Sequence, residues 1–197
     1  ESKSDTRFSY CNTNYAVLAL IIEKVTGMKF PEAMKEMIFT PLGMTNTYVC
    51  DFKKDHENIV PSYKGNNVEI GTDYLDGVYG DKNIYSTVRD LLKFDRARNR
   101  KDFLEPELAK QVYVGYSNER EGKKNYGLGI RMINWKTGQN FYFHNGWWHG
   151  NTSAYITLPK EQVTIIALSN KMNKSTYNVK KVAPLFGDYP FETDTEE

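Results

Sequence analysis

The spacing of apolar residues changes near residue 115, and this change limits the folds that the sequence can adopt. Before it, apolar residues recur mainly at helical spacing, as in NTNYAVLALIIEKVTG at residues 12–27. After it come four strand-like segments, YGLGIRMI, NFYFHN, TSAYITL and VTIIALS, which turn residues separate. This order predicts an α+β fold, with a helical region followed by C-terminal antiparallel strands.

The helical region is predicted to contain four helices, at residues 12–27, 31–38, 87–98 and 106–112. Asn12 or Thr13 can cap the start of the first helix, and Gly27 is a suitable residue to end it. The third helix begins at Thr87, where Thr87 and Asp90 have the spacing of a capping box. A short strand at 47–50 leads into a polar excursion at 51–83, whose length is typical of a functional loop or a subdomain.

The C-terminal part has the patterns of an antiparallel sheet. In TSAYITL, Ala154, Ile156 and Leu158 fall on one face, whereas VTIIALS at 163–169 is apolar throughout, as expected of a strand covered on both faces. A short helix interrupted at Pro184 is predicted at 176–186. We expect one domain over residues 1–197, in which 1–115 are mainly helical and 116–197 hold the strands and a C-terminal tail.

The charge balance excludes two classes of partner. Lys plus Arg total 26 and Asp plus Glu total 25, so no basic surface is available for nucleic acid phosphates. No apolar run could span a membrane, and no polybasic patch could bind one. Cys11 and Cys50 are too few to define a disulfide framework or a zinc site, and two small buried thiols are the simplest interpretation.

Two similar triplets lie eight residues apart in WKTGQNFYFHNGWWHGN, residues 135–151. The first, KTG at 136–138, stands between two strand-like segments and predicts a surface hairpin turn. The second, HNG at 144–146, stands where an apolar strand ends. A glycine there lets another backbone or a ligand approach closely, and Trp147 and Trp148 can line a pocket. A structural histidine and two core tryptophans are the simpler alternative.

The order of several short motifs resembles that of β-lactamase-related serine hydrolases, which include class C β-lactamases, D-Ala-D-Ala carboxypeptidases, D-aminopeptidases and esterases. The matching segments are FSYCNTNYAVLALIIEKVTG, IFTPLGMTNTYV, NIYSTVRDLLKF, YGLGI, and HNG followed by IIALSN. Residues 82–84 replace the small residues usual before the third segment. The resemblance spans nearly the whole chain and implies a β-lactamase/transpeptidase-like fold. It matches HNG, and not KTG at 136–138, to the third sequence box of the family.

The resemblance also implies roles for individual residues. Tyr10 and His144 would be catalytic, Tyr10 as general base or proton relay and His144 as a donor to a substrate carboxylate or an aid to proton transfer. Tyr10 would need nearby positive charge, from His144 or a family lysine, to act near neutral pH. Asn12 would contact the substrate amide or position that lysine, and the Trp147 N–H would form half of an oxyanion hole. The implied substrate-binding residues are Asn12, Asn145, Gly146, Trp147 and Trp148, with no metal and no organic cofactor.

Each of these roles has a structural alternative. Tyr10 could pack against the following helix, Asn12 could cap it, and His144 could donate a hydrogen bond to a backbone carbonyl. A histidine in the third box favours an esterase or a peptidase over a true β-lactamase. The resemblance also implies a periplasmic or exported location.

The family nucleophile is a serine in Ser-x-x-Lys, and no serine here has a lysine three residues later. Ser4 and Ser86 have arginine there, which cannot lose a proton in a protein and so cannot share one with serine. We therefore expect a C-terminal fragment, inactive alone, of a hydrolase that acts by acyl-serine transfer on an ester, amide or D-amino-acid peptide. The missing N-terminal part would pair with residues 163–169; without it, that edge favours dimerisation, strand swapping or rearranged tail packing.

Two alternatives to this function are open. A non-catalytic protein of the same fold could bind cell-wall peptides and lack the serine altogether. A carbohydrate-binding β module could use Trp135, Trp147 and Trp148 as stacking platforms, but that module would be built of strands throughout. Substantial helix would therefore exclude it.

Overall fold

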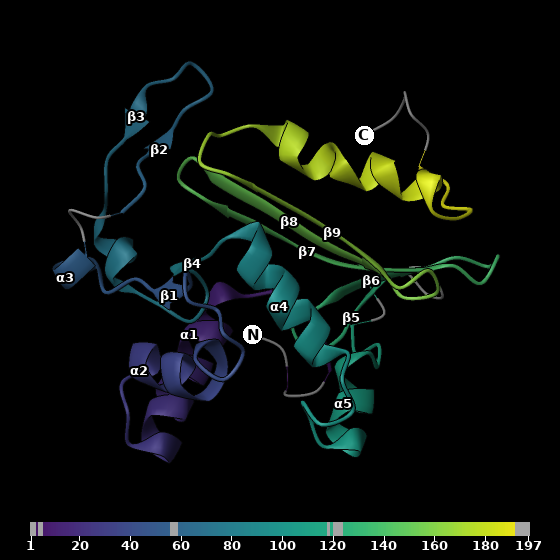
Figure 1. Ribbon diagram of the computed structural model, residues 1–197, viewed down its shortest axis with the longest axis horizontal. Coiled ribbons are helices and arrows are strands. Elements are labelled where there is room, and N and C mark those ends of the chain that lie inside the picture. Colours follow the sequence, from purple (N-terminus) through teal and green to yellow (C-terminus); the bar gives the residue numbers. More distant parts are fainter. Residues whose placement is uncertain (1–2, 4–5, 56–58, 118, 120–123, 192–197) are drawn as a thin grey trace.

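The computed structural model describes residues 3, 6–55, 59–117, 119 and 124–191. A five-stranded sheet has helix α4 (Val88–Arg98) against one face and the 3₁₀ helix η3 (Lys174–Leu185) against the other (Figure 1). Helices α1 (Asn12–Thr26), α2 (Phe30–Met34) and α5 (Pro106–Val112) lie on the α4 side of the sheet (Figure 1). The α+β prediction is confirmed, and the helices exclude an all-strand carbohydrate-binding module.

The sheet follows chain order: β5 (Lys124–Tyr126), β6 (Arg131–Asn134), β7 (Asn140–Trp148), β8 (Asn151–Leu158) and β9 (Val163–Ser169), with each neighbouring pair antiparallel. The segment YGLGIRMI, predicted as one strand, is a hairpin, because Tyr126 pairs with Arg131 and the Gly127 N–H donates to the Ile130 carbonyl. Gly129 has a φ of 76° in this turn, a conformation that glycine adopts without a steric penalty.

The η3 face of the sheet is apolar. Ile156 and Leu158 of β8 pack there with Phe141 of β7 and Ala183 of η3. Ala154 is also buried, so the predicted alternation along β8 is confirmed.

The α4 face carries a buried polar network instead. Asp95 of α4 accepts hydrogen bonds from the hydroxyls of Tyr155 (2.6 Å) and Thr164 (2.9 Å) and from the Arg98 guanidinium (3.0 Å). The side chains of Asp95 and Arg98 are only 8% and 11% exposed, and a buried ion pair is tolerated where hydrogen bonds satisfy its remaining atoms. β9 therefore lies between α4 and η3, as its continuous apolar run predicts, and its outer edge pairs with no strand among the described residues.

Helices α1 and α2 form a second core with the segment that follows them. Its buried members are Ala19, Phe30, Phe39, Met44 and Val49. α1 ends at Gly27, whose φ of 71° is the left-handed conformation common after helices. Its start differs from the prediction, because Asn12 is the first helical residue and Cys11 is the N-cap without a side-chain hydrogen bond. The sequence predicts two buried thiols. Cys50 is buried, but Cys11 is exposed, so that prediction is wrong for Cys11.

The remaining helices lie close to the predicted ranges. α2 continues into a π-helical turn, η1 (Lys35–Phe39), and α5 covers the predicted residues. The Thr87 hydroxyl caps α4 by accepting from the Asp90 N–H. The Asp90 carboxylate does not complete a capping box, because it accepts instead from the Asn46 N–H, the Thr47 hydroxyl and Lys93.

The excursion consists of short elements that are fixed to the sheet. They are α3 (Phe52–Asp55), β2 (Ser62–Tyr63), β3 (Glu69–Ile70) and the 3₁₀ turn η2 (Tyr74–Gly77); at its two ends β1 (Tyr48–Val49) pairs with β4 (Ile84–Tyr85). The β2–β3 hairpin projects beyond the sheet (Figure 1). Tyr63 anchors it, since its N–H donates to the Asn170 carbonyl and its carbonyl accepts from the Met172 N–H. A Cβ on Gly150 would overlap the Tyr63 backbone, so this contact requires glycine. Within the described ranges, no helix is long and apolar enough to cross a bilayer.

Candidate active site

The rings of Tyr10 and His144 lie next to each other, although the two residues are 134 positions apart in the sequence. Their centroids are 6.2 Å apart with an interplanar angle of 34°. Tyr10 lies two residues before the first residue of α1 and is 42% exposed, while His144 is half-buried in the middle of β7. Tyr10 and His144, the two predicted catalytic residues, are therefore close enough in space to act in one site.

Hydrogen bonds engage both ring nitrogens of His144. Nε2 lies 3.1 Å from the Tyr126 hydroxyl, and Nδ1 lies 2.9 Å from the Asn145 carbonyl oxygen. The Tyr126 hydroxyl in turn lies 2.7 Å from the Tyr15 hydroxyl on α1. Burial lowers the pKa of His144, and the Arg131 cation also lowers it, although the Asn145 carbonyl raises it. His144 is therefore neutral at neutral pH.

Arg131 is the cation of this site. Its guanidinium carbon lies 5.0 Å from the Tyr10 ring centroid and 5.4 Å from that of Tyr126, within cation–π range. Burial nevertheless raises the pKa of Tyr10, with a further rise from Tyr15, and Arg131 only partly offsets this. Because the imidazole is neutral, His144 does not supply the positive charge that was expected to act on Tyr10. With only the described residues around it, the Tyr10 phenol is therefore protonated at neutral pH.

The free edge of β7 runs past His144. β6 begins at Arg131, which pairs with Phe143, so residues 144–148 have no partner strand on that side within the part of the chain that the structure describes. On the other side they pair with β8. An open edge of this kind can bind an extended peptide through backbone hydrogen bonds.

The residues predicted to bind substrate do not all face His144. Side chains alternate along a strand, so those of Asn145 and Trp147 project from the face of β7 opposite to His144. The Trp147 side chain is 65% exposed, and its indole N–H donates to the His149 carbonyl. Trp147 therefore does not form an apolar wall beside the imidazole, and only its backbone stays on the relevant edge.

The other predicted positions have structural explanations. A Cβ on Gly146 would overlap the Ser153 hydroxyl of β8, so this glycine makes room for a neighbouring strand. Asn12 is an exposed residue in the first turn of α1, and no contact with His144 or Tyr126 is observed for it. The turn at residues 136–138 is the predicted hairpin, with Gly138 at a φ of 90°.

Trp148 belongs to a second cluster, which sequence reasoning missed. Asp76 of η2 is buried and accepts from the Trp148 indole N–H (2.5 Å) and from the His149 Nε2 (2.9 Å). Lys82 lies over the Trp148 ring at 4.6 Å. His149 has a φ of 51°, which is uncommon for a residue other than glycine. The cluster therefore holds the β7–β8 turn against the excursion.

Asp73, Asp76 and His149 are near enough to one another to hold a metal ion. Their atoms are already used, because Asp76 also accepts from the Asp73 N–H (2.6 Å) and the Asp73 carboxylate accepts from the Leu75 N–H. The donor set thus matches a structural cluster better than a metal site.

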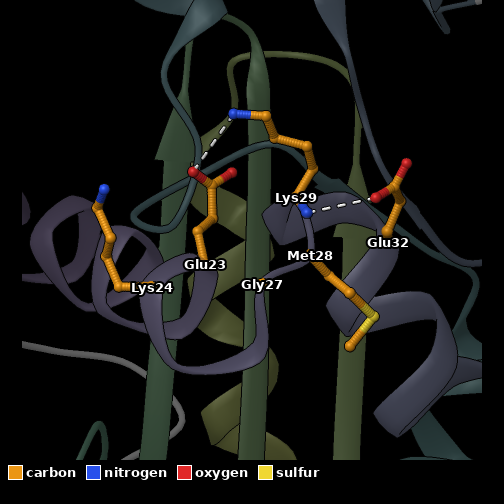
Figure 2. A pocket seen from close by; sticks show the side chains of 6 residues that line it. All are labelled: Glu23, Lys24, Gly27, Met28, Lys29 and Glu32. Carbon is orange, nitrogen blue, oxygen red and sulfur yellow. Dashed lines mark hydrogen bonds and ion pairs between the residues drawn. The ribbon is translucent and has the colours of Figure 1, made fainter.

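A shallow surface pocket lies at the other end of α1 from Tyr10. Figure 2 shows its lining, which comprises Glu23, Lys24, Gly27, Met28, Lys29 and Glu32. The Glu23 carboxylate accepts from the Phe30 N–H and the Tyr79 hydroxyl and pairs with Lys29. These contacts join α1 to α2, so the pocket is a junction between two helices.

Known proteins are similar to this chain in sequence and in fold. The family model described as Beta-lactamase matches residues 1–183. Penicillin-binding protein 4* of Bacillus subtilis (strain 168) is 29% identical over 183 residues, which cover 85% of this chain and 41% of that protein. D-aminopeptidase of Gluconobacter oxydans (strain 621H) is 22% identical over 196 residues, which cover 96% of this chain and 36% of that protein.

The fold has a close counterpart in the penicillin binding protein from Bacillus halodurans. That crystal structure superposes with a TM-score of 0.80 at 20% identity, over 92% of this chain and 57% of the other. The chain spans less than half the length of the two curated relatives above.

Proposed function

The chain belongs to the beta-lactamase family, and on that premise we propose that it forms part of a penicillin-binding-protein-like serine hydrolase. The reaction would be acyl transfer through a serine ester, on an ester, an amide or a D-amino-acid peptide. Penicillin-binding proteins and D-aminopeptidases among its relatives support this class.

One observation carries the proposal, namely the Tyr10 phenol beside the His144 imidazole at the open edge of β7. An extended substrate bound along residues 144–148 would pass next to both rings. The Trp147 N–H on that strand would supply one donor to the oxyanion that forms in acyl transfer. Removing one such donor typically raises the barrier by ~3–4 kcal/mol.

We assign proton transfer to Tyr10, with His144 assisting. Both ring nitrogens of His144 are engaged by protein groups, which favours assistance over direct binding of a substrate carboxylate. The Tyr10 pKa is raised among the described residues, so activation needs a further cation. A Ser-x-x-Lys motif would supply both parts: its lysine would provide this charge, and its serine would be the nucleophile.

The 197 residues contain no Ser-x-x-Lys motif, so we propose that they are inactive alone. A longer form of the protein would carry the motif on a segment that reaches the Tyr10–His144 site. A histidine in the third box supports an ester or a D-amino-acid peptide over a β-lactam as substrate. Periplasmic or exported placement fits this substrate class.

Covalent labelling with a serine-directed phosphonate tests the proposal. We expect the longer protein to be labelled and the 197-residue chain to remain unlabelled. In the longer protein, Tyr10→Phe should slow labelling by roughly 10²–10⁴-fold, the usual contribution of a positioned acid or base. Tyr48→Phe is the matched control, because Tyr48 stacks on Tyr85 away from the site. Labelling of the short chain, or equal rates for the two variants, contradicts the proposal.

The same experiment addresses the alternative of a non-catalytic cell-wall-peptide-binding protein. That function predicts a longer protein without Ser-x-x-Lys, which binds a D-Ala-terminated peptide and is not labelled. The open edge of β7 would serve such binding as well.

We also propose that the outer edge of β9 pairs with a further strand. The edge is apolar and has no partner strand among the described residues, which makes it a site for strand addition. The strand would come from another part of the same protein or from a second copy. Sedimentation distinguishes them: a dimer of the short chain with a monomeric longer protein indicates that the two strands compete for one edge. A monomeric short chain would refute pairing with a second copy, and a longer protein whose outer-edge β9 amides exchange as fast as loop amides would refute pairing with its own strand.

A further inference from the structure

Tyr126 occupies the centre of a chain of three polar side chains behind Tyr10. Its hydroxyl lies between the Tyr15 hydroxyl, at 2.7 Å, and the His144 Nε2, at 3.1 Å. Tyr126 is only 4% exposed, so bulk water does not compete for these bonds. The chain joins α1, β5 and β7, and it lies beside the site proposed for catalysis.

The hydrogen-bond partners fix the direction of each bond when His144 is neutral. The Asn145 carbonyl oxygen can only accept, so the His144 Nδ1 must carry the proton. The neutral ring then has a lone pair on Nε2, which accepts from the Tyr126 hydroxyl. The Tyr126 oxygen is left to accept from the Tyr15 hydroxyl.

The same atoms can also satisfy a charged imidazole. When a proton from solvent binds Nε2, the new N–H donates to the Tyr126 oxygen. The Tyr126 hydroxyl hydrogen then turns to the Tyr15 oxygen, and the Tyr15 hydrogen turns away. Only hydroxyl hydrogens rotate, and no other atom of the chain has to move.

Among the described residues, several titratable groups lie near the imidazole. The Tyr10 ring is 6.2 Å away and tilted by 34°, and Tyr126 meets the imidazole edge-on at 6.1 Å. Arg131 lies over both tyrosines, and its guanidinium is 3.8 Å from the Glu119 carboxylate. Arg131 opposes a charge on His144, whereas the Tyr126 oxygen and the Asn145 carbonyl are the described acceptors that lie within hydrogen-bond distance of its ring nitrogens.

We propose that Tyr126, supported by Tyr15, is a positioning residue that holds His144 in its Nδ1–H form and reverses its hydrogen bond when the imidazole gains a proton. This inference deepens the proposed function, since it assigns to the tyrosine pair the control of the proton state of His144. The imidazole presents no spare N–H in either state, so it acts on the reaction beside Tyr10 and does not hold the substrate itself.

Long-range ¹⁵N–¹H NMR of the histidine rings in the 197-residue chain tests this inference. The chain has only three histidines, and His56 lies outside the described residues. We expect the Nδ1–H pattern for neutral His144 and one titration step. A neutral Nε2–H ring in the unmodified chain overturns the inference, whatever any variant does.

The variant Tyr126→Phe separates a reversing bond from a fixed one. A hydrogen bond to a charged group is worth about twice one between neutral groups, so a reversing tyrosine favours the imidazolium overall. Tyr126→Phe should therefore lower the His144 titration midpoint by about one pH unit. A tyrosine that only donates would favour the neutral ring, and its loss would raise the midpoint. An unchanged or raised midpoint overturns the inference.

Two further variants complete the test. Tyr142→Phe is the matched control, because Tyr142 lies on the same strand and face, two residues from His144, but stacks on Tyr113; it should leave the midpoint unchanged. Tyr15→Phe should lower the midpoint by less than Tyr126→Phe, and it keeps the test decisive if Tyr126→Phe does not fold. These measurements need no nucleophile, so their failure is distinct from a failure of phosphonate labelling in the longer protein.

Discussion

The substitution Asp76→Asn tests whether the cluster around Asp76 holds the β7–β8 turn against the excursion. Asp76 is 4% exposed and accepts hydrogen bonds at both oxygens. Oδ1 accepts from the Trp148 indole and the His149 Nε2, and Oδ2 accepts from the Asp73 N–H and, at 3.1 Å, from the same imidazole. Asparagine replaces one of these oxygens with an NH₂ group. Either orientation then places a donor against a donor.

The magnitude follows from this geometry. A hydrogen bond to a charged group contributes about 1.5–3 kcal/mol, and a buried donor left unpaired costs ~1–3 kcal/mol. The bonds share one carboxylate and are not additive, so we expect Asp76→Asn to lower the free energy of unfolding by about 2–4 kcal/mol. That is a large fraction of the total stability of a typical domain, about 5–15 kcal/mol.

Urea denaturation of the 197-residue chain measures this change. The midpoint should fall at an unchanged slope, which marks a change in stability without a change in the surface exposed on unfolding. Asp102→Asn is the control, because Asp102 forms an exposed pair with Arg100 and its loss should not move the midpoint. Equal midpoints for the two variants would show that the Asp76 bonds do not stabilise the fold, and the anchoring of the turn would need another cause.

Three further predictions concern packing, thiol reactivity and acid stability. Gly150→Ala should destabilise the chain by about 1–3 kcal/mol, because its Cβ overlaps the hairpin backbone, whereas Gly71→Ala meets open space without a left-handed φ and should lower the denaturation midpoint less. A thiol reagent should modify Cys11 quickly, since it is exposed and its thiol pKa is lowered, but should modify Cys50 only on unfolding, since burial raises its pKa to about 11. Burial alone would raise the pKa of the Asp90 carboxyl, but its hydrogen bonds lower that pKa below the ordinary 3.8. The contribution of Asp90 to folding stability is therefore complete above pH 3.8 and is lost as the pH falls through the pKa of the folded state. A stability–pH curve that stays flat below about pH 4 refutes this.

The local sequence pattern was enough to predict the helices and strands in which buried residues recur at a regular spacing. The alternation that buries Ala154, Ile156 and Leu158 can be read directly from the sequence, and the glycine that ends α1 can be as well. The hairpin within YGLGIRMI was missed because its flanking residues are good strand formers, and only the left-handed φ at Gly129 marks the turn.

The candidate site was predictable only in part, because its contacts join distant segments. The motifs supplied Tyr10 and His144, but no local signal links Tyr15 to Tyr126, which are 111 positions apart. The expected position of the Trp147 side chain was wrong because the length of the strand was underestimated. β7 continues to Trp148 and does not end at Asn145, so strict alternation places the side chain of Trp147 on the other face.

The network between Asp95 and Arg98 on α4 has a consequence for how the helix can evolve. An apolar packing contact tolerates small translations and rotations of a helix. A network of hydrogen-bond donors and acceptors is satisfied in only one alignment of the helix on the sheet. Replacements around this network therefore cannot be compensated by a small shift of α4.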